Sequence, residues 1–281
     1  MPHLCHLRLR SKNTIETMGP ASYLPQIIVD PYDRTARLTP GLLVLAPLPV
    51  LVVCLFGSAH LAASSLLSVL GFCGIGFAMS RIVRNAGKRL QDALFLKWGG
   101  TPSVQLLRHR DSHFDRLTKE RFHGVLEKGM GTAMPDAASE SQDPVAADEH
   151  YRAATVWLIS QTRDTKRFPL VLKENIAFGF HRNCLGVRAY GICISIACLL
   201  IALLHSRTLT LTAPFLFPDR LDISAMVAVG IAATMLVTWI FWLTEGAARD
   251  SALAYAERLV QACDVLGSPP KTTPRRRKTA Q

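Results

Sequence analysis

Basic and aromatic side chains alternate through residues 108–168, in a pattern that could hold a polyanion. Proteins that bind single-stranded nucleic acids place cations against the phosphates and aromatic rings against the bases. A simpler interpretation is attraction to anionic lipid, about 1 kcal/mol for each basic residue near the membrane surface. Both interpretations stay open, because acidic residues share the same segment. The candidate ligand residues are Arg108, Arg110, Arg152, Trp157, Arg163, Lys166 and Arg167.

Two histidines, His109 and His113, fall in a segment predicted as one charged helix, residues 107–128, and would share a face of it. A zinc site of the H-E-x-x-H type needs a glutamate between them and a third ligand, and the sequence offers neither. The glycine cluster at residues 71–76 lacks the Lys-Ser/Thr pair of a nucleotide-binding loop. Because no catalytic motif occurs either, we predict no metal, no cofactor and no enzymatic activity.

The hydrophobic residues, 49% of the 281-residue chain, are concentrated in uncharged stretches. No Lys, Arg, Asp or Glu occurs from residue 38 through residue 80, and a membrane span needs roughly 20 apolar residues. This stretch is predicted to hold two spans, residues 40–56 and 61–80, joined by a tight turn. Residues 189–204 and 223–244 are predicted to form a second pair. Each span is interpreted as a helix, because lipid offers no partner for unpaired backbone groups.

The distribution of positive charge predicts the orientation, because cytoplasmic loops of membrane proteins are enriched in Lys and Arg. Residues 1–40, 81–188 and 245–281 carry net charges of +2, +6 and +3, which account for the whole +11 of the chain. Both termini and the central segment are therefore predicted to face the cytoplasm of a bacterial inner membrane. No cleavable signal sequence is expected, since residues 1–25 lack an adequate apolar core.

The predicted fold class is an all-α membrane protein with four transmembrane helices in two hairpins, a small and mostly helical cytoplasmic domain, and a homo-oligomeric assembly. So small a domain cannot bury a sizeable core alone, so it should pack against helices that project from the membrane or against other copies. Projection is predicted for the second span, as far as Leu96, and for the fourth, as far as Leu266. The predicted units are a lead-in (1–39), hairpin 1 (40–80), the cytoplasmic domain (81–188) with a flexible loop (129–148), hairpin 2 (189–244), a cytoplasmic helix (245–266) and a disordered basic tail (267–281).

Small and hydroxyl side chains follow single faces of two spans and could face water in an oligomeric pore. The alternative is close packing and hydrogen bonding between helices, the usual role of such residues in spans. No charged residue lies within a predicted span, which disfavours an ion-coupled transporter and permits a hydroxyl-lined pore. The pore-lining candidates are Ser64, Ser68, Gly71, Gly230, Thr234 and Thr238.

A small polytopic membrane part, a basic cytoplasmic segment and no catalytic motif together resemble the membrane effectors of bacterial anti-phage systems. Over most of the chain the architecture looks most like the channel-forming effector of Hailong-type systems, without a residue-level motif. The resemblance implies an oligomeric channel that is held closed by a DNA oligomer made by a partner nucleotidyltransferase. Loss of that ligand would open the pore, depolarise the membrane and arrest growth. A rival hypothesis is a non-conducting membrane anchor or scaffold that binds lipid and a soluble partner.

Overall fold

The computed structural model describes residues 30–56 and 65–268, with the side chains of residues 56, 65–73 and 76 outside this description. Every named element in these ranges is helical, and the one strand-like feature in them is an isolated bridge between Leu209 and Leu216. Over this part of the chain the protein is therefore all-helical, as predicted. The predicted tight turn and most of the lead-in and basic tail lie outside the described residues.

Three helical segments among the described residues are long and apolar enough to cross a membrane, so the chain is a multi-pass, membrane-associated protein. The predicted second span, residues 61–80, begins outside the described residues and continues as α5 (Ser65–Lys97), so the count of four stays a prediction. The three segments are Asp33–Leu55, made of η2 (Asp33–Leu38), α2 (Thr39–Leu45) and most of α3 (Pro47–Phe56); α10 (Pro169–His205); and Ile223–Trp242, made of α11 (Ile223–Val237) and η4 (Thr238–Trp242).

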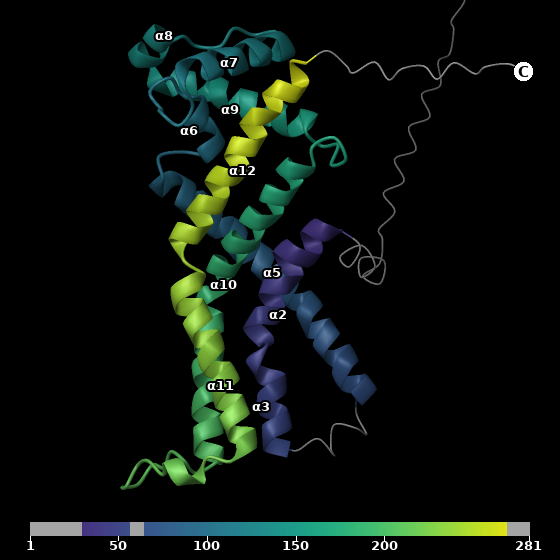
Figure 1. Cartoon of the computed structure of the whole chain (residues 1–281), viewed down its shortest axis with the longest axis vertical. Coiled ribbons are helices and arrows are strands. Elements are labelled where there is room, and N and C mark those ends of the chain that lie inside the picture. Colours follow the sequence, from purple (N-terminus) through teal and green to yellow (C-terminus); the bar gives the residue numbers. More distant parts are fainter. Residues whose placement is uncertain (1–29, 57–64, 269–281) are drawn as a thin grey trace, which may run out of the picture.

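The molecule is elongated, and α10 runs along most of its length (Figure 1). Its 37 residues reach about 55 Å at 1.5 Å per residue, longer than the roughly 30 Å hydrocarbon layer. The helix starts at Pro169, so the domain boundary predicted between residues 188 and 189 falls inside it. Nothing local ends the helix there, because residues 170–205 contain no proline.

Four helices and the end of α12 (Glu245–Leu266) form a head at one end of the molecule, opposite the connection between α10 and α11 (Figure 1). The core of the head includes Phe168 and Val171 from the start of α10, together with Leu259 and Cys263 from α12. This confirms the expectation that so small a domain needs projecting helices to complete its core. The head helices are α6 (Pro102–Leu107), α7 (Arg116–Met130), α8 (Ala137–Gln142) and α9 (Pro144–Gln161).

The prediction of a flexible loop at residues 129–148 is wrong, because this segment contains α8 and the start of α9. Asp136 and Asp143 each precede one of these helices and accept hydrogen bonds from its first backbone N–H groups. Such caps satisfy donors that the helix itself leaves unpaired. Glu140 is 2% exposed, so the segment also contributes a buried carboxylate to the head.

The single charged helix predicted for residues 107–128 is also interrupted. α6 ends at Leu107, and α7 begins only at Arg116, where the Asp115 carboxylate accepts a hydrogen bond from the backbone N–H of Thr118. His109 and His113 therefore lie in a non-helical linker and not on one helix face. Among the described residues, no group of His, Cys, Asp or Glu side chains has the geometry to hold a metal ion.

The segment Ile223–Trp242, predicted as the fourth span, does not continue unbroken into the head. The helix stops at Leu243 (φ −85°, ψ 70°) and restarts at Glu245. Thr244 caps α12 by accepting a hydrogen bond from the backbone N–H of Ala247 at 3.4 Å. Arg188 of α10 donates to the carbonyl oxygens of Trp239 and Ile240, each at 2.8 Å. The guanidinium thus satisfies carbonyl groups near the end of a helix, which have no following turn to bond.

The helices α10 and α5 approach each other closely at two glycines. A Cβ atom added to Gly186 would lie 2.7 Å from the backbone nitrogen of Gly87. Beside this crossing, Asn183 is fully buried and its amide donates to the carbonyl oxygen of Ala36 at 2.5 Å. Glycine is required here because only a residue without a side chain allows two helix backbones to approach so closely.

Candidate anion-binding groove

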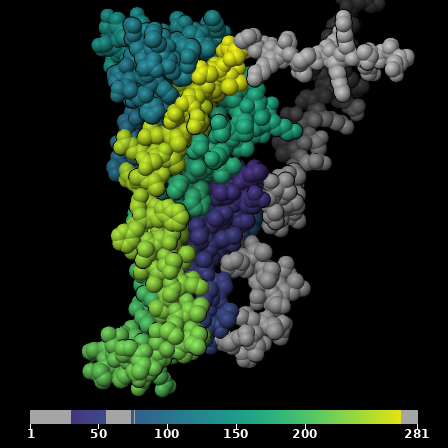
Figure 2. Space-filling model, in the orientation of Figure 1, coloured from purple at the N-terminus to yellow at the C-terminus, as the bar shows by residue number. Residues whose placement is uncertain are grey.

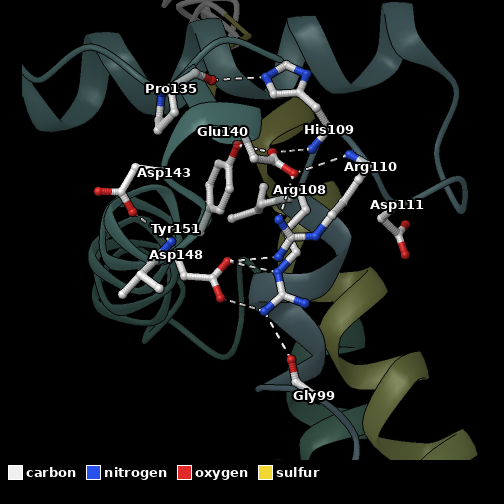
Figure 3. Close-up of polar contacts among 12 residues, drawn as sticks. Gly99, Arg108, His109, Arg110, Asp111, Pro135, Glu140, Asp143, Asp148 and Tyr151 are labelled. Atoms are coloured by element: carbon white, nitrogen blue, oxygen red, sulfur yellow. Dashed lines mark hydrogen bonds and ion pairs between the residues drawn. The ribbon is translucent and has the colours of Figure 1, made fainter. Parts of the chain in front are cut away.

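A network of charged side chains occupies the interior of the head (Figure 3). The carboxylate of Glu140 accepts hydrogen bonds from the backbone N–H of His109 at 2.6 Å and from the Tyr151 hydroxyl at 2.7 Å. Arg110 forms ion pairs with Glu140 at 3.4 Å and with Asp148 at 3.7 Å. These contacts connect the linker between α6 and α7 to α8 and α9.

Arg108, one of the candidate ligand residues, belongs to this network (Figure 3). Its guanidinium makes two hydrogen bonds to the Asp148 carboxylate, at 2.8 and 2.6 Å, and a third to the carbonyl oxygen of Gly99 at 3.0 Å. The side chain is 13% exposed. Because a bidentate pair already uses the guanidinium, the structure gives Arg108 a role inside the head in place of the predicted ligand contact. Arg110 stays half exposed beside it.

The charge state of Glu140 follows from competing effects. Burial alone raises the pKa of this carboxyl, but hydrogen bonds from Tyr151 and from the backbone N–H groups of His109 and Arg110 outweigh it, so the pKa is lowered. Glu140 is therefore ionised at neutral pH. Its protonation would weaken each of these bonds, so the network holds the linker only while the carboxylate keeps its charge.

Two further buried groups hold the same linker from α7. The Lys119 ammonium donates to the carbonyl oxygens of Arg108 and Asp111, at 2.7 and 2.5 Å. His123 bonds the carbonyl oxygen of Leu107 through Nε2 at 2.9 Å. Lys119 is only 3% exposed, so this cation supports the fold and is not available to a ligand.

Lowering the pH from about 7.5 to 5.5 should destabilise the head. Burial lowers the pKa of His123 below its usual value of 6.5, so the unfolded chain takes up a proton in this range before the folded chain does. The midpoint of thermal unfolding of the full chain should therefore fall as the pH falls through about 6.5. His123→Gln, which does not titrate, should show a smaller fall, and an equal fall in both proteins would contradict the assignment to His123.

The other candidate ligand residues divide into two groups. Arg152 is exposed on α9, and Arg163 and Lys166 are exposed in the turn between α9 and α10. Trp157 instead packs against the head core, and a Cβ added to Gly129 would lie 2.2 Å from its ring. Trp157 thus has a packing role and is half-buried, and the stacking role predicted for it stays a prediction.

Arg167, the last candidate, lines an open groove of about 520 Å³ at the end of the head, which we call the arginine groove. Figure 2 shows α10 and α12 side by side below this end of the molecule. The groove is bounded by α7, the start of α10 and the last turns of α12. Its lining residues are His113, Phe114, Asp115, Thr118, Arg121, Phe122, Arg167, Phe168, Pro169, Leu170, Val171, Arg258, Gln261, Ala262, Asp264 and Val265.

Three arginines from separate elements converge on the arginine groove. Arg121 pairs with Asp264 at 3.0 Å, and Arg258 donates to the amide oxygen of Gln261 at 2.8 Å. Arg167 lies over the ring of Phe168 at 5.3 Å and reaches the carbonyl oxygen of Val265 at 3.5 Å. These are exposed, replaceable contacts, so the guanidinium groups can also bind a phosphate.

Aromatic surface lies beside these cations. Phe114 lines the groove and is half-buried, whereas Phe168 and Phe122 are 4% and 1% exposed and belong to the core of the head. The groove thus offers three guanidinium groups to phosphates and one partly accessible ring, that of Phe114, to a base, which is the chemistry of a site for single-stranded nucleic acid. Comparisons with protein-family models, curated proteins and solved structures find no match to this chain. The geometry of its own residues is thus the basis for a functional proposal.

Sequence reasoning found Arg167 but missed the contribution of Arg258. The two residues are 91 positions apart, and only the packing of α12 against the start of α10 brings them to one groove. A local signal existed, because Arg258, Gln261 and Val265 recur at helical spacing on one face of α12. That signal does not show which other element the face meets.

Three of the six pore-lining candidates lie where the structure describes side chains, and these follow α11 and the start of η4. Ser64 lies outside the described residues, and Ser68 and Gly71 belong to α5, where side chains are not described. The remaining candidates are Gly230 and Thr234, exposed on α11, and Thr238, half-buried at the start of η4. The hydroxyls of the two threonines each donate to a carbonyl oxygen four residues earlier, at 2.8 Å. This stripe thus lies on the outer side of a single chain.

Proposed function

We propose that this chain is an oligomeric membrane effector whose ion-conducting pore is controlled by a polyanionic ligand, a nucleic acid or oligonucleotide, in the arginine groove. The observation that carries the proposal is that the groove is built from the head ends of α10 and α12. One of these helices is continuous with a span, and the other is joined to a span at Leu243 and Thr244. A ligand that bridges Arg167 and Arg258 therefore acts directly on the helices that enter the membrane.

The break between α11 and α12 is where binding of the ligand could change the angle between the two helices. α11 can change its angle to α12 at Leu243 and Thr244, where no backbone helix is continuous. Glu245, the first residue of α12, is tied to the end of α5 by bonds to Lys97 at 2.7 Å and to the indole of Trp98 at 3.2 Å. Movement of α12 would therefore be transmitted to α5 as well as to α11.

An assembly of several copies supplies the pore in this proposal. Only 22% of the most apolar part of the segment Ile223–Trp242 is buried within one chain. Most of this segment would therefore face lipid or other copies. The stripe formed by Gly230, Thr234 and Thr238 would line water where copies meet around an axis. The biological setting proposed from architecture is bacterial anti-phage defence, with a nucleotidyltransferase as the source of the oligonucleotide and membrane depolarisation as the outcome.

The alternative function is a non-conducting anchor or scaffold. One observation favours it: the Thr234 and Thr238 hydroxyls are already bonded to their own helix, so they need neither water nor ions as partners. In that case the basic head surface would attract anionic lipid and a soluble partner. The two functions differ in whether the purified chain conducts ions.

Replacing Arg121, Arg167 and Arg258 together by glutamine should weaken binding of a single-stranded DNA oligomer about 100-fold, from roughly 1 kcal/mol for each exposed guanidinium. The slope of log affinity against log salt should become shallower by about 2, since single strands lose roughly 0.7 for each phosphate contact. In liposomes holding the purified chain, ion flux should respond to the oligomer with the wild-type protein and not with this variant.

A matched control removes three exposed charges that do not line the groove, with Arg152, Arg163 and Lys166 changed to glutamine. This control should bind the oligomer nearly as tightly as the wild-type chain. Equal weakening of oligomer binding in both variants would indicate attraction to the overall positive charge of the head and not a specific binding site. A reconstituted oligomer that carries no current with or without DNA would favour the anchor.

A further inference from the structure

A second cavity lies at the opposite end of the molecule from the arginine groove, where α3, α10 and α11 end or begin. It has a volume of about 230 Å³ and is mostly polar. The connection between α10 and α11 closes it through Arg220 of η3 (Pro218–Arg220). Its lining residues are Leu51, Cys54, Leu55, Ala202, His205, Ser206, Arg220, Asp222, Ser224 and Ala225.

An apolar groove of about 720 Å³ lies beside this cavity and runs between α3 and the first turns of α11. The two spaces share Cys54, Asp222 and Ser224, so they lie next to each other. The groove presents large exposed apolar side chains on helices that enter the membrane. Its other lining residues are Val53, Leu221, Ile223, Met226 and Val227.

Charges of both signs line the polar cavity. Arg220 lies over the ring of Phe217 at 4.1 Å, and among the described residues no ion pair joins Arg220 or Asp222 to another side chain. Asp222 caps the start of α11 by accepting hydrogen bonds from Ser224 and from the backbone N–H of Ala225, and the residue stays exposed. The cavity therefore offers a guanidinium to an anion and a carboxylate to a cation.

We propose that the cavity and groove bind one phospholipid with a phosphoethanolamine headgroup. Arg220 and His205 contact the phosphate, Asp222 accepts hydrogen bonds from the ammonium group, and an acyl chain follows the groove along Val53 and Val227. The arrangement fits the membrane, because the charged cavity lies where three apolar segments end and the groove runs along two of them. The two spaces together have the size typical of a small-molecule site.

Other ligands use only part of this site. A free phosphate would contact the guanidinium and leave the apolar groove unused. A phosphatidylglycerol headgroup has no cation for Asp222, and a choline group has no N–H donor for its carboxylate. A bound phosphatidylethanolamine would also reinforce the contact between the Cys54 thiol and the carbonyl oxygen of Ser224, 3.0 Å apart, which joins α3 to α11. This inference does not rest on the proposed channel function.

Native mass spectrometry of the full chain tests the site. The chain is delipidated in detergent and each phospholipid is then added back at equal concentration. We expect one tightly retained phosphatidylethanolamine per chain, with at least about tenfold weaker retention of phosphatidylglycerol and phosphatidylcholine. Inorganic phosphate and glycerophosphoethanolamine, which lacks acyl chains, should not compete at equal concentration. Equal retention of the three lipids would overturn the proposal, as would displacement of the lipid by phosphate alone.

Matched variants locate the lipid. Arg220→Gln and Asp222→Asn should each weaken retention of phosphatidylethanolamine about tenfold, and asparagine preserves the cap of α11. Arg207→Gln and Asp219→Asn make the same changes in the same connection, at residues that do not line the cavity, and should retain the lipid. Equal retention by all four variants would overturn the assignment to Arg220 and Asp222.

Discussion

Replacing Gly186 by valine should prevent α10 from packing against α5 and remove most of the correctly folded protein. A Cβ atom at this position would lie 2.7 Å from the backbone nitrogen of Gly87 and 2.8 Å from the carbonyl carbon of Ala86. Backbone atoms cannot rotate away as a flexible side chain can, so the two helices would have to separate. Overpacking costs typically about 1–3 kcal/mol, and a clash with backbone belongs at or above the upper end of that range.

Separation of these helices would also break a polar contact beside the crossing. The Arg182 guanidinium of α10 would lose the amide oxygen of Gln91 of α5, which it contacts at 2.5 Å. Polar groups that stay buried without a partner are costly. The measurement is the fraction of detergent-solubilised chain that elutes as a single species in size-exclusion chromatography, together with its midpoint of thermal unfolding.

Gly230→Val is the matched control, since nothing lies within 4 Å of a Cβ atom added at Gly230. This variant should fold like the wild-type chain. It also reports on the proposed pore, because the added methyl groups would project from the hydroxyl-bearing face of α11 and reduce ion flux if that face lines water. A Gly186→Val protein with wild-type elution and unfolding would show that the α5–α10 crossing is looser than the structure indicates.

Replacing Glu140 by alanine should unfold the head at moderate temperature. The side chain is 3% exposed and accepts hydrogen bonds from the Tyr151 hydroxyl and from two backbone N–H groups. Its removal leaves these donors, and the charge of Arg110, without their buried partner. Arg110 is half exposed and keeps Asp148 as a partner, so the main cost comes from the hydrogen-bond donors. Each buried donor left without an acceptor costs about 1–3 kcal/mol, and three of them take a large part of the roughly 5–15 kcal/mol that stabilises a typical domain.

Hydrogen exchange localises this effect. Backbone amides of α8 and of the linker from Arg108 to Asp111 should lose protection in Glu140→Ala, while amides of α11 keep theirs. Tyr151→Phe, which removes one donor and leaves the carboxylate its other partners, should cost only about 1 kcal/mol. Glu149→Ala changes an exposed glutamate on α9 and should stay within about 0.5 kcal/mol of the wild-type chain. Equal protection in Glu140→Ala and Glu149→Ala would contradict a structural role for Glu140.

The sequence by itself determined that the chain is helical and where its apolar segments lie. A span is recognised from the composition of about 20 consecutive residues, because the membrane acts on each side chain separately. The long helix α5 illustrates the same point. The sequence predicts that this helix continues beyond the second span as far as Leu96, and the helix ends at Lys97, shortly before two glycines with positive φ. Information of this kind is local, so no knowledge of distant contacts was needed.

The tertiary structure decided which charged residues are available to a ligand. Arg108 and Arg167 look alike in the sequence, but Asp148 lies against the first and α12 brings Arg258 beside the second. The same holds for Glu140, which stands in an acidic, low-complexity stretch and is buried only because His109 and Tyr151 meet it from other elements. The energy of a charge depends on its partners and on its distance from water, and both are set by residues far away in the chain.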